Sequence, residues 1–147
     1  MKRKKFLCSG LVILVLMSGA VPVYAQGAEK VISNNSIVSP QFTAILSMSA
    51  GLSINSSGKA TCSGSVTPSA NTYTSKMTVS LQKSTSKGWS AINSWSGSGV
   101  GYAGVMIEAN YYVANGTYRV CTTVNIYNSA GTLLETESFY SAEKTYQ

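Results

Sequence analysis

Apolar and polar residues alternate with a period of two along most of the chain beyond residue 40. The clearest example lies at 117–127, where every even-numbered residue is aliphatic, aromatic or threonine. Residues of one parity share one face of a strand, and β-branched and aromatic side chains suit a half-buried sheet surface. We therefore predict a central strand over 117–127. The alternation places Val120, Val124 and Ile126 in the core, and Arg119 and Asn125 in solvent.

Other alternating runs predict the remaining strands, and turn-forming residues separate them. Asn115-Gly116 precedes the central strand, and residues 128–131 connect it to its partner, as is common in hairpins. A glycine-rich stretch over 96–104 is predicted to be a flexible loop. The runs lie at 41–54, 59–67, 76–83 and 89–96, from Val105 onward, and at 117–127 and 132–141.

Seven or eight short strands with turn signals at intervals of roughly 8–12 residues are typical of an antiparallel β-sandwich. A small barrel is the alternative. Residues that would cap a helix, together with a helical period, are not found after the first 25 residues. The sequence therefore predicts an all-β domain.

The first 25 residues have the layout of a secretory signal peptide. Residues 2–5 are basic, Phe6–Met17 is mostly apolar, and Val23-Tyr24-Ala25 suits a signal-peptidase site. An uncleaved membrane anchor is the alternative, but the apolar run is shorter than the roughly 20 residues that a span needs. We predict cleavage before Gln26 and secretion, with no stable membrane span left after cleavage. A polar N-terminal arm over 26–41 would then precede a single domain at 42–147.

Charge and composition exclude several kinds of chemistry. Four of the eleven basic residues lie at 2–5, so the rest of the chain keeps seven basic and five acidic residues, net +2, which gives no argument for nucleic acid. The chain has no histidine, which excludes Ser-His and Cys-His nucleophile pairs. Glu135 and Glu137 share one strand face and are expected to form a solvated edge or a surface row rather than a glycosidase pair. We predict no catalytic residue, no metal site, no cofactor and no enzymatic activity.

One short motif brings a family resemblance. Residues 114–120, ANGTYRV, resemble the entry to strand F of immunoglobulin-like and fibronectin-III-like domains. Residues 81–83, Gly88-Trp89 and residues 94–96 are similar to small secreted β-sandwich proteins of Gram-positive bacteria, a family without assigned function. The resemblance covers about residues 44–141. It implies an immunoglobulin-like sandwich of about seven strands and no particular activity.

The resemblance also raises the question of a disulfide between Cys62 and Cys121. In immunoglobulin domains the second cysteine lies two residues after the motif's tyrosine, but here Val120 holds that place and Cys121 follows it. In a regular strand Cys121 then faces away from the core, whereas Cys62 shares the parity of core residues. A bridge needs a bulge near 121–123. Export favours oxidation and hence the bridge; two free thiols are the alternative.

Large aromatic side chains are the candidate binding residues. Such side chains concentrate at interfaces and could form a platform for a sugar or a protein. The alternative places the two tryptophans, which the alternation puts on one face together with Ala91, in the core, and the tyrosines at its edges. The candidates are Trp89, Trp95, Tyr102, Tyr111 and Tyr112.

The sequence as a whole favours a secreted, non-catalytic binding or interaction module. Its partner would be an unknown extracellular protein or glycan: a cell-surface polymer, a host protein or another copy of the chain. The alternative is a secreted bacteriocin-like or toxin-like effector that acts on the envelope of another cell.

Overall fold

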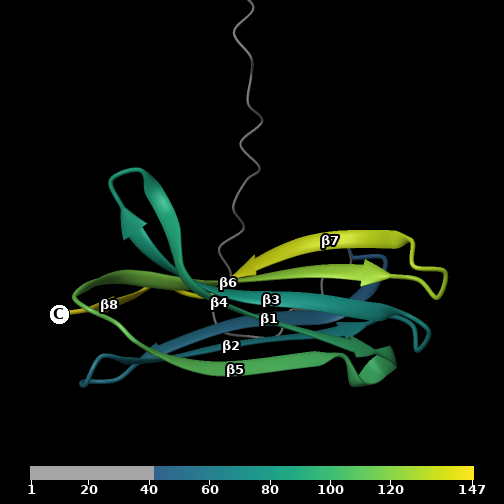
Figure 1. Cartoon of the computed structure of the whole chain (residues 1–147), viewed down its shortest axis with the longest axis horizontal. Coiled ribbons are helices and arrows are strands. Elements are labelled where there is room, and N and C mark those ends of the chain that lie inside the picture. The colour runs from purple at the N-terminus through teal and green to yellow at the C-terminus, as the bar shows by residue number, and fades with distance from the viewer. Residues whose placement is uncertain (1–41) are drawn as a thin grey trace, which may run out of the picture.

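Two antiparallel sheets packed face to face make up the domain (Figure 1). The computed structural model describes residues 42–147, and the signal peptide and arm predicted over 1–25 and 26–41 lie outside them. The first sheet has the order β1 (Ile45–Ile54), β2 (Lys59–Pro68), β5 (Val105–Tyr112). The second has the order β4 (Gly88–Val100), β3 (Thr74–Thr85), β6 (Gly116–Tyr127), β7 (Leu133–Tyr140). The remaining elements are a 3₁₀ turn, η1 (Gly101–Ala103), and β8 (Lys144–Tyr146).

The strand order is that of an immunoglobulin-like sandwich, which confirms the predicted fold class with eight strands and no closed barrel. Strands β1, β2 and β5 take the places of A, B and E. Strands β3, β6 and β7 take those of C, F and G, and β4 extends the sheet beyond β3. The Tyr118 hydroxyl donates a hydrogen bond of 2.5 Å to the carbonyl oxygen of Ala114. This is the tyrosine corner that marks the start of strand F in such domains.

The core lies between the two sheets. Val120, Val124 and Ile126 of β6 are each 0% exposed, as their alternation predicts. The inward-facing residues of β2 and β3 complete the layer, and the close approach of the sheets is visible at Gly64. A Cβ atom there would lie 2.6 Å from both Thr122 Oγ1 and Val79 Cγ2. The two sheets therefore meet without room for a side chain at this point.

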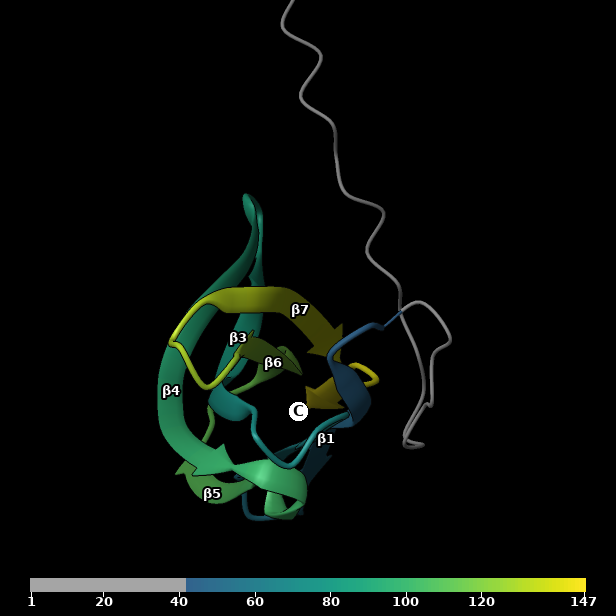
Figure 2. The ribbon, with the colours of Figure 1, turned by 90° about the vertical axis from the view of Figure 1, so that its right-hand side faces the viewer.

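Strand β4 is longer than predicted. The prediction of a flexible loop over 96–104 is wrong for the first half of that range, which belongs to β4. The strand continues to Val100 and stays paired with the start of β3, down to Thr74. Gly97 and Gly99 face the start of β5. A Cβ atom would lie 3.2 Å from Val105 Cγ1 at Gly97 and would collide with the Gly104 carbonyl at Gly99. The glycines let β4 curl round toward β5 and close one side of the sandwich (Figure 2).

A β-bulge in β4 changes which face the tryptophans occupy. Leu81 pairs with Asn93 and Gln82 with Ala91, which leaves Ile92 as the extra residue. An inserted residue reverses the alternation on either side of it. Trp95 therefore points inward and packs against the core, while Trp89 stands on the outer face. The prediction that the two tryptophans share one face is wrong for this reason.

The last strand continues the edge of β7 after a short interruption. Strand β7 pairs with β6 from Cys121 onward, and β8 pairs with the first three residues of β6. Ser141 bridges the gap, because its N–H donates to the Val120 carbonyl and its Oγ accepts from the Val120 N–H, both at 2.9 Å. Ser141 is consequently buried although it lies between two strands.

The outer faces of both sheets are polar but carry few charges. Hydroxyl groups on neighbouring strands bond to one another, which stabilises the strand pairing. The pairs are Ser49–Ser65 at 2.7 Å, Thr78–Ser96 at 2.8 Å, Ser80–Ser94 at 2.9 Å, and Thr123–Ser138 and Thr117–Thr145 at 3.0 Å.

Candidate functional site

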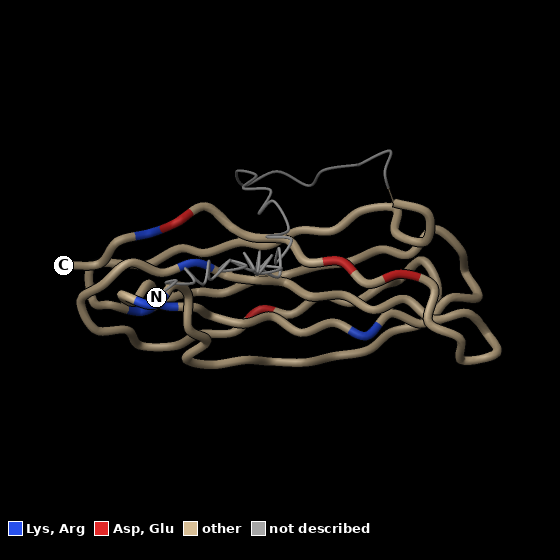
Figure 3. The backbone as a smooth tube through the Cα atoms, turned by 90° about the horizontal axis from the view of Figure 1, so that it is seen from above, with Lys and Arg blue, Asp and Glu red and all other residues tan. Residues whose placement is uncertain are grey.

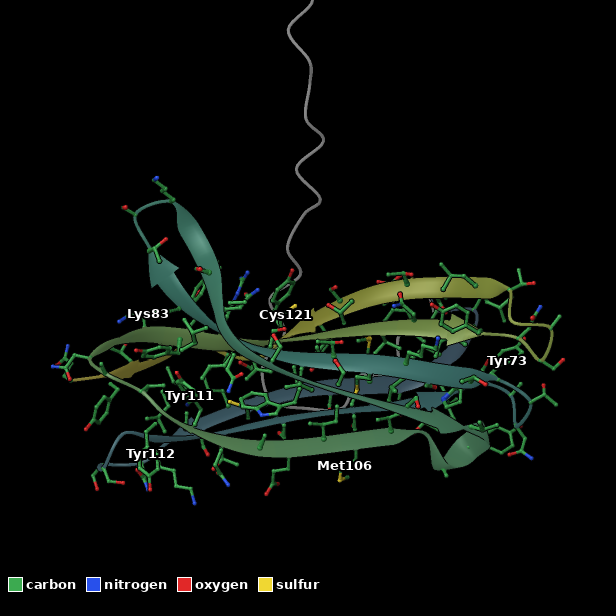
Figure 4. All side chains as sticks on the ribbon, viewed as in Figure 1. Tyr73, Lys83, Met106, Tyr111, Tyr112 and Cys121 are labelled. Atoms are coloured by element: carbon green, nitrogen blue, oxygen red, sulfur yellow. The ribbon has the colours of Figure 1, made fainter. Side chains whose placement is uncertain are left out.

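The five aromatic residues proposed from the sequence do not come together on one surface. Trp95 and Tyr111 are half-buried and pack against the core from β4 and β5. Tyr112, 71% exposed, points away from the outer face of β5 (Figure 4), and Tyr102 in η1 is 58% exposed. Trp89 lies on the outer face of the other sheet. The structure thus contains no single platform made of these five side chains.

Trp89 instead belongs to an aromatic–arginine stack on the outer face of β6. The Arg119 guanidinium lies 4.4 Å from the centre of the Trp89 ring and 4.2 Å from that of Tyr140. Its Nε donates to Gln82 Oε1 at 2.8 Å. A planar guanidinium between two rings gains cation–π attraction while its edge remains open to hydrogen bonds. We call Trp89, Arg119 and Tyr140 the arginine stack.

The prediction that the Arg119 side chain faces solvent is wrong. Its parity is the predicted one, since it points away from the core, but only 4% of it is exposed because the two rings cover it. Nothing in the local sequence places Trp89 or Tyr140 beside Arg119. Trp89 lies in β4, two strands from β6, and Tyr140 in β7. The stack can be predicted only once the strand order and the bulge are known.

The arginine stack braces a hairpin that projects from the sandwich (Figure 1). The pairing of β3 with β6 ends at Lys83, so Ser84–Trp89 forms a two-stranded tip that pairs only with itself. Trp89 packs back onto Arg119, and Lys83 Nζ donates to the Asn115 carbonyl at 3.1 Å. Residues 84–88 are exposed. The hairpin has a fixed base and a solvent-exposed tip.

The charged residues are distributed unevenly along the sandwich (Figure 3). We call the end at which β6 begins the hairpin end. Lys83 and Lys144 both pair with Tyr118 there, and Lys59 pairs with Tyr112 at the end of β5. Within residues 42–147 the hairpin end carries Lys59, Lys83, Lys87, Arg119 and Lys144 against Glu143, and the opposite end carries Lys76 against Glu135 and Glu137. Glu108 lies between the two ends, opposite Ser63.

The cysteines lie on opposite faces, and the expected bridge between them does not form. Cys62 is fully buried in the core, whereas Cys121 is on the outer face with its Sγ 3.7 Å from Thr123 Oγ1 (Figure 4). Both are free. The pairing of β6 is regular through 121–123, so the bulge that a bridge needs is not there. Burial raises the pKa of the Cys62 thiol to about 11, which keeps it protonated and unreactive at neutral pH.

Glu135 and Glu137 point to the inner side of the edge strand β7. Glu135 accepts hydrogen bonds from the N–H groups of Ala44, at 2.7 Å, and Thr43, at 3.3 Å, and so holds the chain where it enters β1. Desolvation, and then the neighbouring Glu135, raise the pKa of Glu137. Inward-pointing charges on an edge strand discourage pairing with another sheet. Glu135 thus has a structural role, and the predicted row of two carboxylates lies half-buried on the inner side of the sheet edge rather than on an open surface.

A shallow depression on the outer face of the second sheet is a further candidate site that the sequence did not suggest. Hydroxyl and amide groups line it, with one ammonium group. Its lining lies toward the end opposite the hairpin end, since Lys76 pairs with Asn125. The polar lining side chains are Lys76, Thr78, Ser96, Ser98 and Asn125.

Two absences are specific to the described part of the chain. Over residues 42–147, no three side chains of His, Cys, Asp or Glu group together in a way that could hold a metal ion. In the same range, no helix has the length and apolar character needed to cross a membrane.

Comparison with known proteins adds no relative. No protein-family model matches the chain, and no curated protein sequence is significantly similar to it. The geometry of the hairpin end and the arginine stack is therefore the basis on which a function can be argued.

Proposed function

We propose that the protein is a secreted, non-catalytic binding module that recognises its partner with the hairpin end. The observation that carries this proposal is the arginine stack, which braces the β3–β4 hairpin at its base while residues 84–88 stay exposed. Its partner is a molecule of the extracellular space, and secretion follows from the signal peptide at 1–25.

Burial of the guanidinium in the arginine stack costs free energy that a simple connection between two strands does not require. A buried guanidinium loses its hydration and has to be compensated by its partners. The tip that it braces contributes no residue to the core, and an isolated two-stranded hairpin is marginal in water. Rigid scaffolds that present exposed loops are the usual architecture of recognition sites. The brace therefore holds the exposed tip in a fixed position, as presentation to a partner requires.

The test is retention of the purified protein on extracellular material. The mature protein is incubated with Gram-positive cell envelopes and with host extracellular matrix, and the bound fraction is measured after washing. A tip variant replaces Thr85–Gly88 by Asn-Gly, which joins Ser84 to Trp89 by a two-residue turn and leaves the arginine stack in place. We expect the native protein to be retained and the tip variant to lose most of its retention.

The matched control alters the β6–β7 loop at the opposite end, by Ala130→Ser, and should be retained like the native protein. Unfolding midpoints of all three proteins show that each is folded. Equal retention of the tip variant, or no retention of the native protein on any material, contradicts the proposal. Growth inhibition of indicator bacteria by the native protein would support the effector alternative instead.

A further inference from the structure

Four segments, joined by hydrogen bonds, form the surface of the hairpin end. The N–H of Val113 donates to the Gly58 carbonyl at 2.9 Å, which joins the β5–β6 connection to the β1–β2 turn. Lys83 Nζ bonds the Asn115 carbonyl at 3.1 Å, which joins the same connection to the hairpin. The Tyr146 hydroxyl reaches the Ser56 carbonyl at 3.5 Å, which adds β8.

The charge of this surface is positive. Lys87 and Lys144 are exposed, and Lys59 and Lys83 are partly exposed. Arg119 is covered by its rings and contributes little to what a ligand meets. Glu143 is the one acidic residue at this end of the described chain. The opposite end, with Lys76, Glu135 and Glu137, has an excess of negative charge.

The loops beside the lysines are mostly polar. The β1–β2 turn is Asn55-Ser56-Ser57-Gly58, the β5–β6 connection is Val113-Ala114-Asn115, and the hairpin tip is Ser84-Thr85-Ser86-Lys87-Gly88. Segments that lie in a bilayer surface present Trp, Phe or Leu beside their basic residues, and these three loops contain none of them. The four lysines also come from separate strands and loops, which suits a ligand with repeated charges better than a single phosphate.

We propose that the hairpin end binds a linear polyanion of a cell surface, a polymer of polyol units joined by phosphodiesters. This inference rests on the proposed function and names the chemistry of its partner. Successive phosphates of such a chain can meet lysines from different strands and from the hairpin tip, while its hydroxyl groups bond the Ser and Asn side chains between them. Attraction between exposed charges is screened by salt, so binding is salt-dependent.

The experiment titrates the mature protein with fluorescent poly(glycerol phosphate) in 50 mM NaCl and compares three variants that each lose one positive charge. Lys87→Gln and Lys144→Gln change exposed lysines of the hairpin end, and Lys76→Gln changes an exposed lysine at the opposite end. The net charge of the three variants is identical. Each lysine near an anionic surface contributes roughly a fivefold factor. We expect about fivefold weaker binding for the first two, less than twofold for Lys76→Gln, and at least about tenfold weakening in 0.5 M NaCl.

Any of several results would overturn the inference. The first is an equal effect of all three variants, which would mean that net charge and not the hairpin end governs binding. The second is tighter binding, per phosphate, to phosphatidylglycerol vesicles or duplex DNA, or salt-insensitive binding to neutral dextran. If envelopes retain the native protein but not the tip variant, and neither salt nor Lys87→Gln changes this, the inference fails while the proposed function stands. If no extracellular material retains the native protein, the proposed function itself fails.

Discussion

Thr122 places a hydroxyl group in the core without giving it a partner. Its side chain is 0% exposed on the inner face of β6, and its Oγ1 has no hydrogen-bond partner in the described structure. It packs where the sheets approach most closely, against Gly64. A buried, unpaired hydroxyl costs free energy that a methyl group of the same shape does not.

Thr122→Val should therefore leave the free energy of unfolding unchanged or raise it by up to about 1–2 kcal/mol. Valine has nearly the same shape, so no cavity and no collision with Gly64 is introduced. Urea unfolding midpoints measure the change. Thr123→Val, on the outer face, is the comparison, since it removes a 3.0 Å bond to Ser138 and should cost up to about 1 kcal/mol. Destabilisation by Thr122→Val larger than that by Thr123→Val would mean that the hydroxyl has a partner.

Arg119 is stabilised by the shape of its guanidinium as well as by its charge. Arg119→Lys keeps the charge but loses the planar group that lies between Trp89 and Tyr140, as well as the Nε that donates to Gln82. We expect the free energy of unfolding to fall by about 1–3 kcal/mol, with a change in the tryptophan emission. Lys76→Ala removes an exposed lysine 4.9 Å from the Tyr127 ring and should cost less than about 0.5 kcal/mol. Similar losses from both variants would show that the stack is not a brace.

At the scale of single elements, alternation predicts a strand well where one face stays apolar and the other stays polar along its whole length. Strand β6 could be predicted from its own sequence alone, because its inward-facing residues are all apolar or threonine. The end of β4 could not be predicted in this way. Gly97 and Gly99 have no side chain whose polarity could show which face of the strand is buried. Glycine is needed at both positions because the chain at the start of β5 leaves no room for a Cβ atom. Strand β8 was missed because three residues are too few to show a period.

The bulge at Ile92 is another feature that only the pairing reveals. Deletion of Ile92 should remove the bulge and leave Gln82 paired with Ala91 and Ser84 with Trp89, so that Trp89 keeps its place on the outer face beside Arg119. We expect the native tryptophan emission and a loss of stability smaller than that of Arg119→Lys. Tryptophan fluorescence and urea midpoints measure both effects. Ile92→Thr keeps the residue count and is the control. Loss of the native emission, which a one-residue deletion in a strand without a bulge would cause, would mean that the register of β4 is not the one described.

Glu137 in the edge strand β7 should make the free energy of unfolding depend on pH. The folded state raises the pKa of Glu137 above its ordinary value of 4.5, so the folded protein holds this proton more tightly than the unfolded chain does. The free energy of unfolding should then increase as pH falls through the raised pKa toward 4.5, and the cost of the charge is present in full above it. Glu137→Gln should remove this dependence and stabilise the protein at pH 7. Urea unfolding from pH 7 to 4.5 tests this. A variant curve parallel to that of the native protein would contradict it.

At the scale of the whole molecule, the sequence predicted the architecture but not the site. The sandwich follows from strand number, spacing and the ANGTYRV motif. The candidate binding residues were chosen by size, and size alone does not say on which side of a sheet a ring lies. The hairpin end carries Lys59, Lys87 and Lys144, which come from distant parts of the chain. Their placement at one end of the sandwich depends on the fold as a whole.

Export is the remaining prediction for the whole chain. Cleavage at the Val23-Tyr24-Ala25 site should give a secreted protein that begins at Gln26. The intact mass of protein collected from culture medium measures this directly, and a Gln26 that has cyclised would appear as a small, defined loss of mass. Replacement of Ala25 by a bulky residue should block processing. A secreted form that still carries residues 1–25 would contradict the prediction.

Because strand β8 is short, the domain should resist a pulling force less at its C-terminal side than at its N-terminal side. The chain enters β1 beside Glu135, at one end of the long axis, and leaves through β8 at the other. Tension between these ends would shear β1 against β2 along nine residue pairs but β8 against β6 along only three. Strand β8 would therefore yield first and carry Lys144 away with it, until the Ser141 bonds to Val120 bear the force. A bound chain would then be released more readily when the protein is pulled by its C-terminal side than when it is pulled by Thr43.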